Sequence, residues 1–181
     1  MLDTGTVWDI VRKRKQRSYK KDVENWEQDL AKTKTYEELV DIVIAEARSW
    51  IGVPFHHQGR TKAGCDCVAV AMACAKKVDC EFEDWTQYGR LPHAGKLQKS
   101  FANAGIRIPV KDIAPADGVL ITWKIEPHHV GIITRMKTGA LGILHSYASI
   151  GRVVEHHLDE TWRKRIVLAF RLPILYEKKV K

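Results

Sequence analysis

The sequence has no apolar run long enough to cross a membrane. Its first residues also lack the basic, then apolar, then small-residue order of a secretory signal, so we expect no signal peptide. Aromatic residues make up only 8% of the chain, and they are not interleaved with basic residues in a nucleic-acid-binding motif. We therefore expect no membrane span and no specific nucleic acid binding.

Cysteine is scarce, and its spacing is not typical of a metal site. The four cysteines stand at positions 65, 67, 74 and 80. This spacing does not match the usual zinc or iron–sulfur patterns, and no secretion signal favours disulfides. We expect no metal and no cofactor, with Cys74 and Cys80 as buried structural thiols. A zinc or iron–sulfur site is the alternative, and metal analysis of purified protein would reveal it.

Acidic residues are outnumbered by basic ones, which gives the 181-residue chain a formal net charge of +8. With 45% hydrophobic and 29% charged residues the composition is that of a globular protein of about one domain. The excess positive charge favours polyanions such as nucleic acid, an anionic membrane surface or phosphate-rich cell-wall polymers. Charge alone does not choose among them.

The chain divides into three parts. Residues 1–35 form a basic extension in which Tyr19, Val23, Trp26 and Leu30 repeat at helical spacing. This amphipathic helix is either a docking arm or a solvated helix packed on its own domain. Residues 36–173 form the main domain, and residues 174–181 form a basic tail, of which 177–181 is expected to be solvated.

Within the main domain, helices precede strands. Helices are predicted at about 36–50, from the cysteines to about 77, and at 96–104. Short β-branched and aromatic segments then predict strands at 119–123, 130–135, 142–147, 152–156 and 166–171. We therefore predict an α+β fold in which the helices pack on a five-stranded antiparallel sheet.

The chemistry is expected to start at Cys67. A turn at Gly64 delivers this cysteine to the head of an apolar helix, where the helix dipole favours thiolate over thiol. A thiol nucleophile needs a base, and predicted strands carry His129 and His145. Adjacent strand residues face opposite ways, so only one of His128 and His129 can face the thiol.

Two alternatives to this site remain open. Cys67 is either a nucleophile or a core thiol, and its neighbour Cys65 is the other cysteine that could be mistaken for the nucleophile. Asp66 fits the N-cap of the helix better than a catalytic role.

The ordered motifs resemble the NlpC family of papain-like cell-wall cysteine peptidases over residues 37–173. In chain order these motifs are a Gly-x-Pro-Phe loop and an Asp-Cys pair at the head of a helix. Two strands follow, one with the sequence His-Val-Gly-Ile and one with the sequence Leu-His. The segments at 54–60, 64–67, 151–156 and 169–173 look most like the branch encoded by phages, prophages and gene transfer agents. The resemblance implies a papain-like fold with the nucleophile at a helix N-terminus.

The resemblance also implies roles for individual residues. Cys67 would be the nucleophile, His129 the base, and His145 the third polar group that orients the His129 ring. The family loop commonly carries Tyr where this chain has Phe55. Nearby substrate or oxyanion positions would include Phe55, His56, Gln58 and Asp66.

The implied activity is cysteine endopeptidase cleavage of an amide in peptidoglycan stem peptides. The enzyme would be made in the bacterial cytoplasm and carried at the tail tip of a phage or phage-like virion, to open the cell wall for DNA delivery. Its partners would be peptidoglycan and, through the N-terminal helix, tail-tip or baseplate proteins. A structural tail component with a weak or inactive peptidase fold is one alternative, and a papain-like transferase or deamidase is another.

Overall fold

The computed structural model describes residues 34–84, 95–123 and 126–180, so the predicted Tyr19–Leu30 helix lies outside the described residues.

The start of the first described helix is fixed by its own sequence. Helix α2 (Tyr36–Arg48) begins at Thr35, whose hydroxyl accepts from the Glu38 backbone while the Glu38 carboxylate accepts from the Thr35 backbone. This reciprocal capping box satisfies two N–H groups that the helix leaves unpaired.

Six strands form one antiparallel sheet in the order β3-β8-β4-β5-β6-β7. Their bounds are β3 (Ile106–Ile108), β4 (Gly118–Ile121), β5 (His129–Arg135), β6 (Leu141–Tyr147), β7 (Arg152–His157) and β8 (Ile166–Arg171). A separate two-stranded ribbon is made by β1 (Arg60–Thr61) and β2 (Gly64–Cys65). The predicted helix-then-strand order is confirmed.

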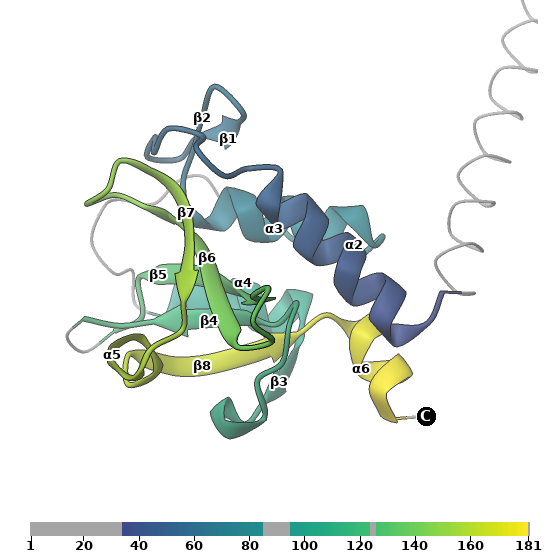
Figure 1. Ribbon diagram of the computed structural model, residues 1–181. Helices are drawn as coiled ribbons and strands as arrows, with labels where there is room; N and C mark the ends of the chain where they lie inside the picture. The colour runs from purple at the N-terminus through teal and green to yellow at the C-terminus, as the bar shows by residue number, and fades with distance from the viewer. Residues whose placement is uncertain (1–33, 85–94, 124–125, 181) are drawn as a thin grey trace, which may run out of the picture. The chain divides into compact units, whose positions relative to one another are not determined.

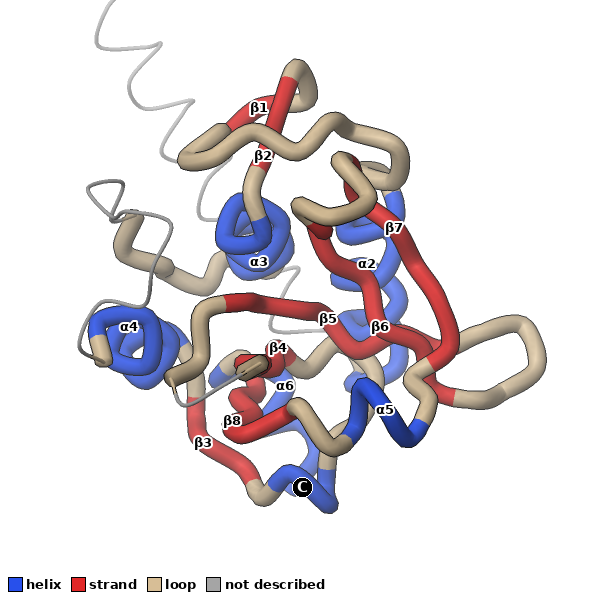
Figure 2. The backbone as a smooth tube through the Cα atoms, turned by 90° about the vertical axis from the view of Figure 1, so that its left-hand side faces the viewer, coloured by secondary structure: helices blue, strands red, loops and turns tan. Residues whose placement is uncertain are grey.

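The two faces of the sheet carry separate apolar clusters. Helices α2 and α3 (Cys67–Lys77) pack with Val130, Ile132 and Leu144 on one face. Val119, Ile133 and Ile143 belong to the other cluster, with Trp162 packed against it. Figure 1 shows α2 and α3 side by side, with the sheet between them and α5 (Glu160–Arg163). Figure 2 looks nearly along α3 and shows the β1–β2 ribbon beside it.

The remaining helices connect or close the sheet. Helix α4 (Lys96–Ala104) leads through Gly105 into β3, and a short 3₁₀ turn at Val110–Asp112 follows. Helix α6 (Pro173–Val180) follows β8. No helix among the described residues combines the length and apolar character needed to cross a membrane.

One expectation requires correction, and one element is additional to the predictions. Among the described residues the sheet has six strands and not five, because Ile106–Ile108 pairs with β8, and three residues are too few to show a recognisable period. The segment expected as a basic tail belongs to helix α6, whose Leu175 is fully buried in the same cluster as α2 and α3, whereas Tyr176 and Glu177 are exposed.

Candidate active site

The start of α3 is organised by one buried carboxylate. Asp66 caps the helix, with Oδ1 accepting from the backbone N–H groups of Val68 and Ala69 at 3.0 and 3.1 Å. Arg60 donates to the same oxygen at 2.8 Å, and the Gln58 backbone donates to Oδ2 at 3.0 Å. Asp66 therefore fixes both the helix N-terminus and the loop before it, and its predicted capping role is confirmed.

The loop that precedes Cys67 is held by backbone contacts. Phe55 is half-buried, donates to the Gly151 carbonyl at 2.8 Å and bridges to Cys65. The His56 backbone donates to the Cys65 carbonyl at 2.9 Å, while the side chains of His56 and Gln58 are exposed. Gln58 has a φ of 60°, in the left-handed region, so its conformation is set by the loop.

Three histidines form a continuous hydrogen-bonded row across β5, β6 and β7. His129 Nε2 lies 2.6 Å from His145 Nδ1, and His145 Nε2 lies 3.1 Å from His156 Nε2. His156 Nδ1 in turn lies 2.9 Å from the backbone carbonyl of His157. We call His129, His145 and His156 the histidine row. The expected meeting of His129 and His145 is therefore seen.

Strand register explains why these side chains meet. Ile133 pairs with Ile143, so His129 and His145, which stand an even number of residues from them, lie on the same face. His156 pairs with Ile143 and is diagonal to His145 on that face. His129 is buried, whereas His128 is exposed and bonded to the Glu126 carbonyl at 2.9 Å.

The Cys67 thiol reaches β5 next to His129. Backbone N–H groups of Val130 and of Cys67 itself contact the sulfur and lower its pKa. Burial first, and then the Asp66 charge, outweigh them and raise the pKa of Cys67 to about 12. Burial and the Asp66 charge therefore act against the thiolate that the helix dipole favours.

The histidines beside it are also neutral. Burial, followed by the neighbouring His145, holds the pKa of His129 well below its usual value. Burial and then His156 lower the pKa of His145 to about 3. Both rings therefore remain unprotonated near pH 7. Among the described residues no hydrogen bond joins Cys67 to His129.

Aromatic side chains enclose the histidine row. Tyr147 stacks on His145 with ring centroids 5.0 Å apart and an angle of 16° between the planes. Trp162 from α5 meets His145 edge-on at 4.8 Å, and Trp123 meets His129 at 5.3 Å. These contacts hold the imidazole planes and shield them from water.

The sequence did not single out His156. The signal was available, because residues 152–156 were predicted as a strand and a histidine at its end could share a face with His145. The missing information was the register between β6 and β7, which decides which residues face each other. Among the described residues no group of three or more His, Cys, Asp or Glu side chains is arranged to hold a metal ion.

A cysteine at the head of a helix that packs on an antiparallel sheet bearing a histidine row defines a papain-like fold. The NlpC/P60 family model matches residues 52–171, which is more than half of the chain. The chain belongs to the NlpC/P60 family. A search of curated proteins found no match.

Solved structures share this fold at low identity. The NlpC/P60 domain of the peptidoglycan hydrolase SagA is 19% identical, with a TM-score of 0.54 over 74% of this chain and 98% of that one. The peptidoglycan hydrolase RipB from Mycobacterium tuberculosis is 19% identical, with a TM-score of 0.53 over 75% of this chain and 65% of that one. An NlpC/P60 protein from Bacillus cereus is 16% identical, with a TM-score of 0.55 over 74% of this chain and 40% of that one. The chain thus spans less than half of that longer relative.

Proposed function

We propose that this protein is a cysteine endopeptidase that hydrolyses an amide bond in peptidoglycan stem peptides. The observation that carries the proposal is the bonded His129–His145 pair, together with the contact of the helix-head Cys67 with the backbone of Val130, the residue after His129, in a chain of the NlpC/P60 family. Structural relatives that are named as peptidoglycan hydrolases support the substrate class.

In the proposed reaction His129 acts as a general base. It takes the thiol proton of Cys67, and the sulfur attacks the amide carbonyl to form a tetrahedral oxyanion. The Cys67 backbone N–H stabilises that oxyanion. His129 then returns the proton to the leaving amine, and the C–N bond breaks to give a thioester. Water, deprotonated by His129, releases the acid and restores the thiol.

The neutral resting state defines how this reaction starts. Because the thiol pKa is about 12 and His129 is unprotonated, the proton moves as the substrate binds and excludes water. Asp66 remains a structural group in this scheme, since its carboxylate holds the helix start, the Gln58 backbone and Arg60.

We further propose that the enzyme is carried at the tail tip of a phage or phage-like particle. The support is the likeness of its loop and strand motifs to that branch of the family, together with a net charge of +8 that favours an anionic wall. Mass spectrometry of purified particles would test this, because a chain absent from them is not a virion component.

The activity is tested by digesting purified sacculi with the full chain and reading the products by mass spectrometry. Wild type should release cut stem peptides, and Cys67→Ala should release none. Cys65→Ala is the matched control, because this buried thiol stands two residues away and outside the proposed chemistry. Cleavage by Cys67→Ala would disprove the assignment.

A transferase or deamidase would use the same cysteine and base. An added amine distinguishes the transferase, because it would capture the thioester in place of water. If folded wild type cuts no sacculi and captures no amine, the structural tail component becomes the better explanation.

A further inference from the structure

The histidine row ends on a group that can only accept a hydrogen bond. The His157 backbone carbonyl lies 2.9 Å from His156 Nδ1, so that nitrogen must carry the proton. The neutral form of His156 has one N–H, so in that form its Nε2 is an acceptor. The opposite tautomer would set two lone pairs against each other.

The direction of the next two bonds follows from this end. His145 Nε2, 3.1 Å from His156 Nε2, must donate, which leaves His145 Nδ1 as an acceptor. His129 Nε2, 2.6 Å from that atom, must therefore donate as well. The remaining nitrogen of His129 is Nδ1, and it keeps its lone pair.

We propose that His156 is a positioning residue whose bond to the His157 carbonyl fixes the tautomers of the whole histidine row and leaves His129 Nδ1 as the basic atom. This rests on the proposed function, in which His129 takes the proton of Cys67. Because His129 and His145 are neutral, each of these rings carries a single N–H, and the row has to fix only which nitrogen carries it.

The same arrangement suits both stages of the reaction. When His129 Nδ1 gains a proton, Nε2–H still donates to His145, so no bond in the row must reverse. Preorganisation of this kind lowers the barrier, because no reorientation is required during the step.

His156 has no evident substitute in this role. Tyr147 covers the flat face of His145, and Trp162 contacts both His145 at 4.8 Å and His156 at 5.0 Å. Without His156 the proton of His145 is free to occupy either nitrogen, and part of the molecules would present the wrong tautomer to His129.

The test reads tautomers directly. Long-range ¹H–¹⁵N correlation spectra of the labelled full chain at pH 7, without substrate, report which nitrogen of each ring is protonated. Wild type should show Nε2–H for His145 and Nδ1–H for His156. His156→Leu removes the acceptor and should give mixed His145 tautomers, whereas His156→Gln supplies Oε1 as an acceptor and should restore one.

The kinetic test uses kcat on a soluble stem peptide. His156→Leu should lower kcat at least about tenfold, because a wrong tautomer of a catalytic histidine costs up to about 10⁴-fold. His156→Gln should recover most of the loss. His157→Gln is the matched control, because the His157 side chain is exposed on the same strand and lies outside the row.

The outcomes separate the two proposals. Nε2–H on His156 in wild type, or an unchanged single His145 tautomer in His156→Leu, would overturn the positioning role even if sacculi are cut. If the spectra show the expected tautomers but no stem peptide is cleaved, the positioning role of His156 is supported and the proposed function is rejected. If His156→Leu does not fold, the wild-type and His156→Gln spectra still decide.

Discussion

At the scale of single residues, Asp66 has two opposing effects on the site. Its carboxylate caps α3 and holds the loop through Arg60, but its charge also raises the pKa of the Cys67 thiol. A helix that begins with a buried anion therefore gives its first cysteine less thiolate than the helix dipole alone would give. The sequence indicated the cap, whereas the depth of burial of the thiol depends on the packing of α3 against β5.

Asp66→Asn should lower the pKa of Cys67. The amide keeps an acceptor for the helix cap but removes the negative charge, and so removes one cause of the raised value. The pH profile of Cys67 alkylation, followed by mass spectrometry, should move to lower pH. Asp84→Asn is the control, because Asp84 also pairs with Arg60 at 3.0 Å without capping α3. An unshifted profile for Asp66→Asn would contradict this electrostatic account.

At the scale of elements, Gly131 lets β5 and β6 approach in the His-Val-Gly-Ile motif. A Cβ atom at Gly131 would lie 2.6 Å from Ile143 Cδ1. Gly131→Ala should therefore destabilise the fold by about 1–3 kcal/mol through overpacking. Ile143→Ala removes both clashing atoms, Cδ1 and Cγ1 (2.8 Å), so the double variant should lose less free energy of unfolding in urea than the sum of the two single variants. Strictly additive free energies of unfolding would show that the contact is not the cause.

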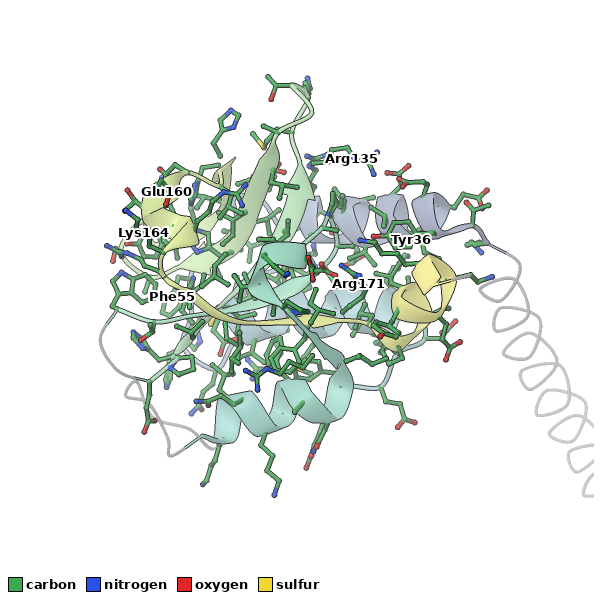
Figure 3. The ribbon with its side chains drawn as sticks, turned by 90° about the horizontal axis from the view of Figure 1, so that it is seen from below. Tyr36, Phe55, Arg135, Glu160, Lys164 and Arg171 are labelled. Carbon is green, nitrogen blue, oxygen red and sulfur yellow. The ribbon has the colours of Figure 1, made fainter. Side chains whose placement is uncertain are left out.

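A buried ion pair joins the end of β8 to the turn before β4. Arg171 donates to both carboxylate oxygens of Asp117, at 2.8 and 2.7 Å, and both residues are buried. Figure 3 shows Arg171 toward Tyr36 and well away from Phe55, so this pair lies outside the proposed active site.

Asp117→Ala should cost about 3–5 kcal/mol in free energy of unfolding, because Arg171 would remain charged and buried without its partner. Glu37→Ala breaks the exposed pair with Arg135 and should cost no more than about 1 kcal/mol. Urea unfolding of the two variants gives both values, and equal costs would refute the role of burial.

How far the elements follow from sequence depends on their length and local signals. The cap at Thr35, the helix from Lys96 to Ala104 and the strand carrying His145 all follow from local patterns. Strand β3 and the C-terminal helix do not, because each is stabilised by partners distant in sequence, β8 in the first case. His156 belongs to the same category, since its role appears only once the register between β6 and β7 is known.

At the scale of the whole molecule, the neutral histidines link stability to pH. The folded pKa of His145 is about 3, against 6.5 for an ordinary histidine, and that of His129 is also lowered. Below pH 6.5 the unfolded chain therefore binds more protons than the folded one. The stabilisation is fully present above about pH 6.5 and is lost as pH falls toward 3.

His145 alone should contribute a slope of up to about 1.4 kcal/mol per pH unit between pH 6.5 and 3. Urea unfolding at several pH values should show wild type losing stability steeply across this window. His145→Gln should flatten the slope by about that amount, because glutamine does not titrate. His157→Gln, at an exposed position on β7, should keep the steep slope. Parallel slopes for wild type and His145→Gln would mean that His145 is protonated in the folded protein, which would also remove the neutral row on which the proposed reaction depends.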